Sequence, residues 1–238
     1  IRDRSVSRGR GDVYKRQGGG KTVDTAKVIA NRYNTPVIVV PTAASTDAPT
    51  SALSVIYTKE GVHDSLIFHK QNPNIVLLDS EIIKEAPVRL LVSGMGDALA
   101  TYFEARANYE SKSNNFVGKG YRQSITGMTI ARKCYETLLE DGLKAKISCE
   151  KKVTSEALEN IIETNTLMSG LGFENTGCAA SHGLHDALTI LPETSKYYHG
   201  EKVAFGVLCE LILENRNKDE IDDCLLYTSP SPRDTERS

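Results

Sequence analysis

The sequence has 238 residues, enough for one large or two modest domains. Of these residues 39% are hydrophobic and 25% are charged, which is typical of a globular protein with a buried core. The net charge of -2 argues against nucleic acid or an anionic membrane surface as a partner. No apolar run is long enough to cross a membrane, and no signal peptide is visible. Five scattered cysteines without a Cys-x-x-Cys pair argue against a zinc knuckle or a disulfide framework, and favour a reducing, cytoplasmic setting.

The two ends of the chain differ from the rest. Residues 1–17 are basic and lack apolar periodicity, and residues 7–17 closely resemble a translated transposon adapter used in sequencing libraries. Residues 224–234 resemble the same adapter read on the opposite strand. We therefore interpret residues 1–17 as a non-native leader and 224–238 as a non-native tail, and exclude both from the fold prediction. On this interpretation residues 18–223 are an internal piece of a longer protein; native disordered tails are the alternative.

The first part of residues 18–223 predicts α/β structure. A Gly-rich turn opens a helix whose apolar residues fall at helical spacing. Residues 37–40 and 74–79 are apolar runs that predict buried strands, the first of them parallel. Residues 53–57 alternate in polarity, which predicts a strand of a hairpin or a sheet edge, with its turn at residues 59–61.

The second part predicts helices alone. Ser80 is expected to cap a short helix that Pro87 interrupts or restarts. Further helical patterns cover residues 88–108, 116–140, 154–168, 178–189 and 201–215. The pairs Asp141-Gly142 and Ser169-Gly170 are expected to end two of these helices. The predicted fold class is an α/β segment, residues 18–86, followed by an all-helical segment, residues 87–223.

The Gly-rich turn is a candidate phosphate site. The glycines Gly18, Gly19 and Gly20 allow the backbone to approach a phosphate, the helix that follows offers free N–H groups, and Lys21 adds charge. Neither the P-loop spacing nor the G-x-G-x-x-G fingerprint can be demonstrated. A plain tight turn is the structural alternative, but the helix and the Val-rich strand that follow favour phosphate binding.

A polar loop follows the first predicted strand directly. Loops at the carboxyl ends of parallel strands bind ligands in α/β sheets. Thr42, Ser45 and Thr46 could donate hydrogen bonds to a phosphate or ribose, and Asp47 could accept from a sugar or polyol hydroxyl. A helix N-cap cluster uses the same residue types, so both interpretations stay open.

Three residues form a candidate metal site. Asp97 lies among glycines and other small residues, and His182 and His199 lie in helical patterns or at their start. One carboxylate and two imidazoles leave coordination positions free, as a catalytic metal requires, and suit Zn²⁺ or Fe²⁺ about equally. His185 shares a helix face with His182. Two other histidines lie in the charged stretch 61–70 and are assigned no role: His63 and His69.

Together these residues resemble the glycerol dehydrogenases of the iron-containing (metal-dependent) alcohol dehydrogenase superfamily, over residues 18–215. The carrying motifs are GGGKTVDTAK (18–27), VPTAASTDAPTSALSVIY (40–57), GMGDALATYFEA (94–105) and HGEKVAFG (199–206). The resemblance implies a dehydroquinate-synthase-like fold, truncated at both ends here. In that fold a nucleotide-binding α/β domain precedes a helical metal domain, and the active site lies in the cleft between them.

The resemblance also implies roles for individual residues. The metal ligands would be Asp97, His182 and His199, and Asp47 would bind a glycerol hydroxyl. Iron-type relatives have a histidine four residues after the aspartate, where this chain has Thr101, so a three-ligand site is expected, usually for zinc. The residues that would contact the cofactor are Gly18, Gly19, Gly20, Lys21, Thr22, Asp24, Thr42, Ser45, Ser51, Leu53 and Tyr57.

The implied function is hydride transfer from glycerol or a similar small polyol to NAD, assisted by a divalent metal. His185 could relay the proton, although a supporting or packing role is as compatible. A phosphate-bearing substrate, as in glycerol-1-phosphate dehydrogenase or dehydroquinate synthase, would need basic residues near the metal, whereas the Asp47 loop is neutral to acidic. A third possibility is that these 238 residues are inactive as they stand, and we expect low or no activity. Family members form large homo-oligomers, so the parent protein is expected to do so.

Overall fold

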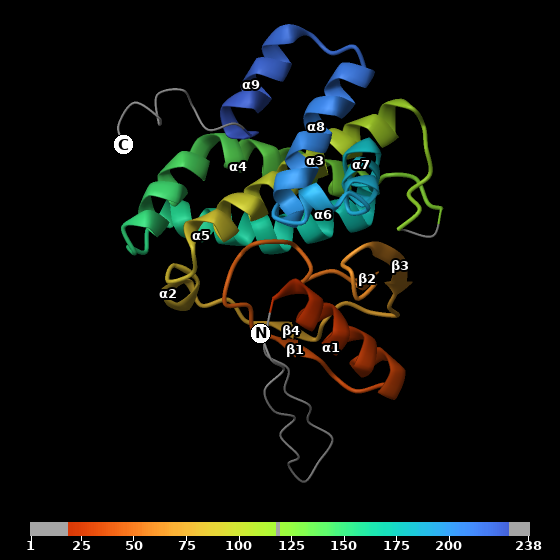
Figure 1. Ribbon diagram of the computed structural model, residues 1–238, viewed down its shortest axis with the longest axis vertical. Coiled ribbons are helices and arrows are strands. Elements are labelled where there is room, and N and C mark those ends of the chain that lie inside the picture. Colours follow the sequence, from red (N-terminus) through yellow and green to blue (C-terminus); the bar gives the residue numbers. More distant parts are fainter. Residues whose placement is uncertain (1–18, 118–119, 229–238) are drawn as a thin grey trace.

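The computed structural model describes residues 19–117 and 120–228. The chain folds into a smaller α/β segment and a larger helical segment that lie against each other (Figure 1). The change occurs at Pro87, which is the N-cap of the first long helix. This arrangement confirms the predicted fold class, whereas the assignment of two domains within residues 18–86 and 87–223 stays a prediction.

The α/β segment contains two small sheets instead of one. Helix α1 (Gly20–Tyr33) leads to β1 (Ile38–Val39), which pairs in parallel with β4 (Ile75–Val76). Between them, β2 (Leu53–Tyr57) and β3 (His63–Phe68) form the predicted antiparallel hairpin. Its turn contains Gly61 at a φ of 89°, a backbone conformation that favours glycine.

The prediction that residues 37–40 and 74–79 form buried strands is correct for the parallel pairing and wrong for the burial. Val39 is buried, but Ile38 is 61% exposed and Ile75 is 52% exposed. The reason is that β1 and β4 pair only with each other within the described residues, and a sheet of two strands leaves side chains of both strands open to solvent.

Helix α2 (Ser80–Ile83) lies just before the border between the segments, and the helical segment begins with α3 (Val88–Glu110). The cap of α2 is Asp79 and not Ser80 as predicted, because the Asp79 carboxylate accepts from the backbone N–H groups of Glu81 and Ile82. Six further elements follow α3 within the described residues: α4 (Ile125–Glu150), α5 (Glu156–Glu163), α6 (Ser169–Thr176), α7 (Ala180–Leu188), α8 (His199–Leu213) and α9 (Lys218–Thr228). Two short turns, the π-helical η1 (Thr164–Met168) and the 3-10 η2 (Pro192–Thr194), complete the chain.

Three helix boundaries differ from the prediction. The second long helix starts at Ile125, since Asn115 and Tyr121 instead form an isolated bridge, and it continues through Asp141-Gly142. Asp141 does not end the helix because its carboxylate accepts from Lys144 and Asn160. Likewise the chain stays helical through Ser169-Gly170, since η1 joins α5 to α6.

Helix α9 was not predicted, because the residues from 224 onward were set aside as a tail and residues 216–223 show no strong apolar pattern.

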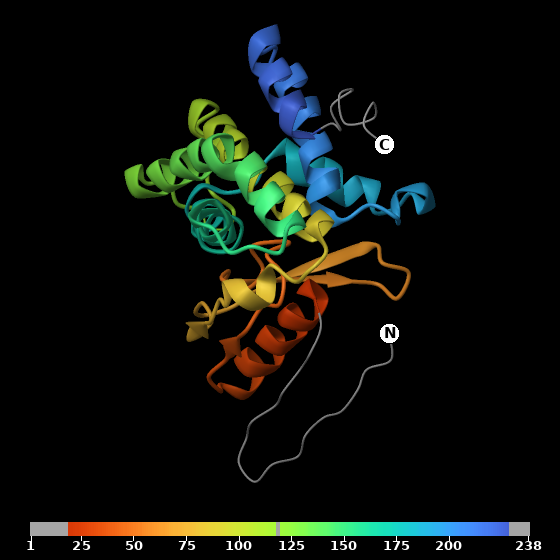
Figure 2. The same ribbon diagram turned by 90° about the vertical axis from the view of Figure 1, so that its left-hand side faces the viewer.

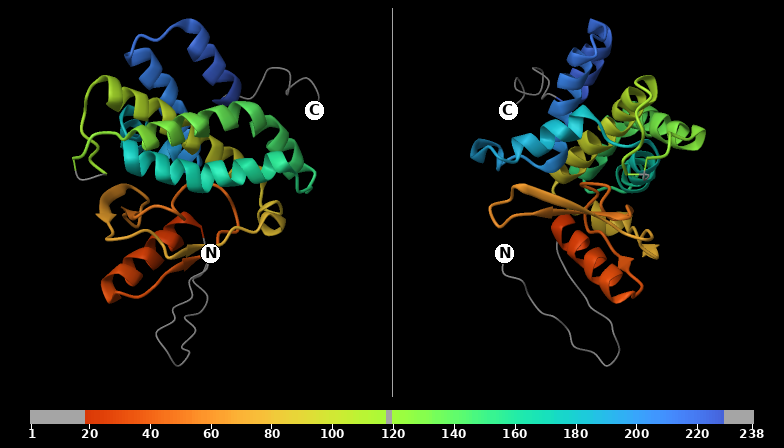
Figure 3. Two further views of the ribbon diagram at one scale, coloured as in Figure 1. Left: turned by 180° about the vertical axis from the view of Figure 1, so that it is seen from behind. Right: turned by 90° about the vertical axis from the view of Figure 1, so that its right-hand side faces the viewer.

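The core lies around α3, which packs against α4, α6 and α8. Its buried side chains include the small Ala98, Ala100 and Ala105 and the large Phe103, Leu91 and Leu99. Helices α5 and α6 form the face of the helical segment that lies next to the α/β segment, as Figure 3 shows from behind. Figure 2 shows the β2–β3 hairpin reaching out beneath the helices. Small residues on α3 thus let several helices approach the middle of the molecule closely.

Within the described residues, no helix combines the length and the apolar character that a membrane span requires.

Candidate metal centre and cavity

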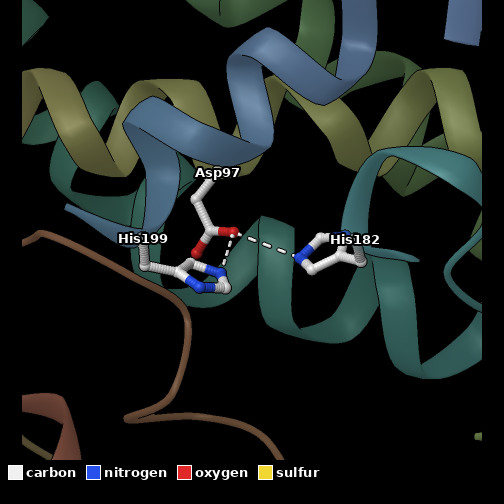
Figure 4. Close-up of side chains that lie close together, drawn as sticks. All are labelled: Asp97, His182 and His199. Carbon is white, nitrogen blue, oxygen red and sulfur yellow. Dashed lines mark hydrogen bonds and ion pairs between the residues drawn. The ribbon is translucent and has the colours of Figure 1, made fainter. Parts of the chain in front are cut away.

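Asp97, His182 and His199 meet at one point, although more than 80 residues separate the first from the others (Figure 4). Asp97 lies in the middle of α3 and its side chain is 1% exposed. Its Oδ1 is 3.0 Å from Nε2 of His199 and 3.4 Å from Nε2 of His182. The ligand atoms of the three residues all lie within 4.8 Å of one another. The sequence prediction of their convergence therefore agrees with the geometry.

Glycines explain how three helices come this close. A Cβ at Gly200 would lie 1.7 Å from the carbonyl oxygen of Ser93, and a Cβ at Gly96 would lie 2.5 Å from the carbonyl oxygen of Gly200. The start of α8 therefore rests directly on the backbone of α3, which places His199 beside Asp97. In the same way Gly206 lets α8 contact the backbone of Ser181, next to His182.

Glu104 orients His182. It lies seven residues after Asp97 on the same face of α3 and is fully buried. Its Oε1 accepts from the backbone N–H groups of Ala179 and His182, and its Oε2 is 2.7 Å from Nδ1 of His182. With the proton on Nδ1, the Nε2 lone pair of His182 faces Asp97, as a metal ligand requires. The sequence analysis missed Glu104; its spacing from Asp97 in an Ala-rich helix is the signal that could have identified it.

Cys178 belongs to the same neighbourhood. Its thiol, the Glu104 carboxylate and the His182 imidazole form a second group whose ligand atoms lie within 4.8 Å of one another. Burial raises the pKa of the Cys178 thiol to about 11, and the Glu104 carboxylate already accepts three hydrogen bonds. We therefore regard this group as support for His182.

His185 orients His199 in the same way. Its Nε2 is 3.0 Å from Nδ1 of His199, and its Nδ1 is 3.0 Å from Oδ1 of Asp186. Burial lowers the pKa of His185 to about 4, so this imidazole is neutral near pH 7. A neutral His185 that donates from Nδ1 to Asp186 accepts at Nε2 from His199. This leaves Nε2 of His199 free to face Asp97.

The electrostatics of the three residues fit a cation. Burial would raise the pKa of Asp97, but the His199 and His182 imidazoles outweigh burial and hold this pKa well below its ordinary value. Burial would lower the pKa of His182, but Glu104, Cys178 and Asp97 together outweigh burial and raise this pKa well above its ordinary value. Oδ2 of Asp97 is buried and has no hydrogen-bond partner among the described residues. Because a buried polar atom without a partner is costly, this oxygen is a ready position for a metal ion.

A cavity of about 350 Å³ lies beside the three ligands, between the two segments. It brings together most of the residues that the sequence predicted for cofactor, substrate and metal, namely Gly20, Lys21, Asp24, Ser45, Asp47, Ser51, Leu53, Tyr57, His182, His185 and His199. Apolar side chains form much of the remaining wall, among them Phe116 and Phe173. The cavity thus combines apolar walls with a few polar groups, as small-molecule sites do.

Other predicted residues lie elsewhere. Thr42 is exposed, and Gly19, Thr22 and Thr42 are absent from the cavity wall. Gly19 is the N-cap of α1 and Thr22 lies in its first turn. Gly18 lies outside the described residues. Of the described residues at the start of α1, only Gly20 and Lys21 therefore line the cavity.

Lys27 is a buried cation that the sequence analysis missed. Its Nζ is 3.1 Å from Oδ1 of Asp24 and donates to the backbone carbonyls of Ala48, Ser51 and Leu53. Asp24 lines the cavity, and through its ion pair with Lys27 it also helps to hold the loop in place. Lys27 in this way fixes the backbone that carries Ser51 and Leu53.

His63 also lines the cavity, although the sequence analysis gave it no role. The hairpin brings it to α7, where its backbone N–H donates to Oγ1 of Thr189 at 3.0 Å and its Nε2 is 3.8 Å from Asp186. No local pattern in residues 61–70 indicates this contact, because it depends on how the hairpin lies against a helix more than 120 residues away.

Comparison with known proteins shows which proteins this chain is similar to. The family model described as iron-containing alcohol dehydrogenase matches residues 12–87. The glycerol dehydrogenase of Citrobacter freundii is 50% identical to this chain over 210 residues, and that of Thermotoga maritima is 53% identical over 212 residues. The chain is therefore similar to glycerol dehydrogenases and, over residues 12–87, to the iron-containing alcohol dehydrogenase family.

Solved structures of glycerol dehydrogenases have a similar fold. A probable glycerol dehydrogenase from Sinorhizobium meliloti superimposes with a TM-score of 0.86 at 52% identity, covering 88% of this chain and 59% of that one. The glycerol dehydrogenase of Schizosaccharomyces pombe gives a TM-score of 0.85 at 45% identity, covering 89% and 53%. The alignments with the Citrobacter and Thermotoga relatives include 88% and 89% of this chain but 57% and 58% of those proteins. The chain therefore spans little more than half the length of the relatives it matches.

Proposed function

We propose that this chain carries the metal-binding and cofactor-facing parts of an NAD-dependent dehydrogenase that oxidises glycerol or a similar small polyol to the corresponding hydroxyketone. The observation that carries the proposal is the convergence of Asp97, His182 and His199 beside a cavity that also contains Asp47. The similarity to glycerol dehydrogenases supports the substrate class.

The donor set suits a divalent cation held by one carboxylate oxygen and two imidazole nitrogens. Such a cation would act as a Lewis acid that lowers the pKa of a substrate hydroxyl, and the nicotinamide would accept the hydride. We propose zinc in preference to iron, because position 101, where iron-type relatives supply a histidine, holds a threonine. His185 and Glu104 contribute by fixing the tautomers of the two ligand histidines.

Asp47 would bind a second hydroxyl of the substrate. Its Oδ2 accepts from Oγ of Ser169 at 2.8 Å, and the cavity gives the carboxyl access to a ligand. Burial, together with the negative charge of Asp97, raises the pKa of Asp47 to about 7. Asp47 can therefore accept a hydrogen bond from a polyol hydroxyl above this pH and donate one below it.

The cofactor would lie along the start of α1 and the β2 strand. The first backbone N–H groups of a helix have no partner within the helix, so the N–H groups at Gly20 and Lys21 can bind a pyrophosphate. Ser45, Ser51, Leu53 and Tyr57 form the adjoining wall of the cavity. Lys21 is the one Lys or Arg side chain among the described residues that line this cavity, which favours a neutral substrate over a phosphate ester.

A small polyol as ligand, a homo-oligomeric parent protein and a cytoplasmic setting accompany this proposal as expectations. For the 238 residues alone we expect low or no turnover.

The test is glycerol-dependent formation of NADH by the purified chain with added Zn²⁺, alongside equilibrium binding of Zn²⁺ and NAD. Binding of both with little turnover is the expected result. Absence of both binding events would contradict the proposed site, and rapid turnover would contradict the expectation of low activity. Turnover with glycerol 1-phosphate but not with glycerol would contradict the neutral substrate.

A further inference from the structure

Thr101 occupies the position at which iron-type relatives would supply a fourth ligand, and its side chain has another partner. It lies four residues after Asp97, one turn further along α3 and about 6 Å along the helix axis. It is 2% exposed, and its Oγ1 is 3.0 Å from Oγ of Ser169. The threonine hydroxyl therefore points to α6.

Ser169 in turn forms a hydrogen bond with Asp47. It is the first residue of α6 and is fully buried, and its Oγ donates to Oδ2 of Asp47 at 2.8 Å. A hydroxyl has one proton, so while the Asp47 carboxylate is ionised Ser169 must accept from Thr101. The three side chains form a directed chain of hydrogen bonds from α3, through α6, to the loop that follows β1.

The packing around this chain of bonds leaves little room for movement. A Cβ at Gly172 would lie 2.5 Å from Cγ2 of Thr101, so α6 presses directly against the threonine. A Cβ at Gly170 would lie 3.1 Å from Cβ of Thr50 and 3.5 Å from the carbonyl oxygen of Asp47. Glycines on α6 thus let α3 and the Asp47 loop approach it closely, as the small side chains of a buried contact do.

The π turn η1 comes immediately before Ser169. A π turn inserts an extra residue into the helix and so rotates the following residues about the helix axis. On the turn itself, Nδ2 of Asn165 donates to the carbonyl oxygens of Ala44 and Leu91, which ties η1 to both the Asp47 loop and α3. The same three elements are therefore joined twice, at Asn165 and at Ser169.

We propose that Thr101 and Ser169 are positioning residues that hold the Asp47 carboxylate at a set place relative to Asp97, and so select substrates with hydroxyls on neighbouring carbons over simple alcohols. Thr101 and Asp97 lie on the same helix, so the hydrogen bonds fix the position of Asp47 relative to the helix that carries a metal ligand. This inference rests on the proposed function and deepens it. In place of a fourth metal ligand, position 101 serves the second hydroxyl of the substrate.

The experiment compares 1,2-propanediol with 1-propanol on the Zn²⁺-loaded chain. Binding of each alcohol is measured by saturation-transfer NMR, and kcat and KM are measured with NAD where turnover permits. The variants are Ser169→Ala, Thr101→Val and Thr101→Ser, which keeps the hydroxyl. Ser148→Ala is the matched control, because it removes a hydroxyl on α4 that lies 2.8 Å from Oγ of Ser155, the N-cap of α5, away from the cavity.

Ser169→Ala and Thr101→Val are expected to weaken binding of the diol about tenfold, the loss of one hydrogen bond to a charged group, and to leave 1-propanol unchanged. Thr101→Ser should retain the wild-type preference, and so should Ser148→Ala. In the Asp47→Ala background, Ser169→Ala should have no further effect, because the residue acts through Asp47. Zn²⁺ stoichiometry and the far-UV circular dichroism spectrum should be the same for every variant.

Two results would overturn the inference. If wild type prefers the diol but Ser169→Ala and Thr101→Val keep that preference, the positioning role is wrong and the proposed function stands. If wild type binds both alcohols alike, the polyol function and the inference fail together. A variant that fails to fold is replaced by Ser169→Cys, which keeps a weak donor and should give an intermediate preference.

Discussion

Gly200 lies so close to Ser93 that a Cβ at position 200 would be 1.7 Å from the Ser93 carbonyl oxygen. This contact fixes the start of α8 against the middle of α3, and with it the distance between His199 and Asp97. The metal centre therefore depends on a backbone contact as much as on its ligands.

Gly200→Ala should accordingly separate α8 from α3. Overpacking a buried contact typically costs about 1–3 kcal/mol of unfolding free energy, and Zn²⁺ affinity should fall as well. Urea unfolding with and without Zn²⁺ measures both effects. The control is Gly183→Ala on α7, where nothing lies within 4 Å of the added Cβ. This exposed helix position should be unchanged or slightly stabilised, and equal effects of the two substitutions would contradict the explanation.

Glu104→Ala should weaken the metal centre without removing a ligand. The carboxylate holds Nδ1 of His182 at 2.7 Å, and loss of such a supporting partner typically reduces metal affinity about 10- to 100-fold. Competition with a chelator for Zn²⁺ measures the change. Glu163→Gln, at an exposed position on the same helical segment, is the control. Unchanged affinity in Glu104→Ala would show that His182 does not need this orientation.

Glu210 should make stability fall as the pH rises. Burial, together with the negative charge of Glu104, raises the pKa of Glu210 from its ordinary 4.5 to about 7, and its Oε1 has no hydrogen-bond partner among the described residues. Between these two values the folded state binds a proton that the unfolded state has lost, so stability decreases with pH. Glu210→Gln should remove roughly 1–3 kcal/mol of this decrease. Unfolding free energies at pH 5 and pH 7.5 test this, and parallel pH profiles for the two proteins would contradict it.

Lys27→Met should destabilise the α/β segment by about 3–5 kcal/mol, because it leaves the buried Asp24 carboxylate unpaired. Adding Asp24→Asn should recover part of the loss. The pair of Lys84 and Glu81, in which the carboxylate is exposed, offers a comparison, since Lys84→Met should cost about 1 kcal/mol or less. Equal losses for Lys27→Met and Lys84→Met, measured by urea unfolding, would argue against a structural ion pair.

The sequence predicts those parts of the structure that local patterns encode. The β2–β3 hairpin and the helix that carries Asp97 follow from alternation and helical periodicity. The burial of the short strands β1 and β4 is harder to predict, because it depends on what covers a strand and not on the strand's own residues. Val39 is buried while Ile38 on the same strand is open.

Residues that act through distant contacts are not predictable from local patterns. Asp97, His182 and His199 could be named because carboxylate and imidazole groups are typical metal ligands. Lys27 and His63 could not, since each has its role only through partners from another part of the chain. For Glu104 the only local signal is its spacing of seven residues from Asp97, and its contact with His182 comes from a distant part of the chain. Asp141-Gly142 misled the helix prediction for the same reason, as Asn160 satisfies the carboxylate that would otherwise favour a helix end.

Zn²⁺ binding measured by isothermal titration calorimetry tests the central claim most directly. We expect one equivalent bound by the wild-type chain, none by His199→Ala, and one by His69→Ala, whose imidazole contacts Ser54 away from the ligand group. Equal Zn²⁺ binding by wild type and His199→Ala, or no binding by the folded wild-type chain, would contradict it.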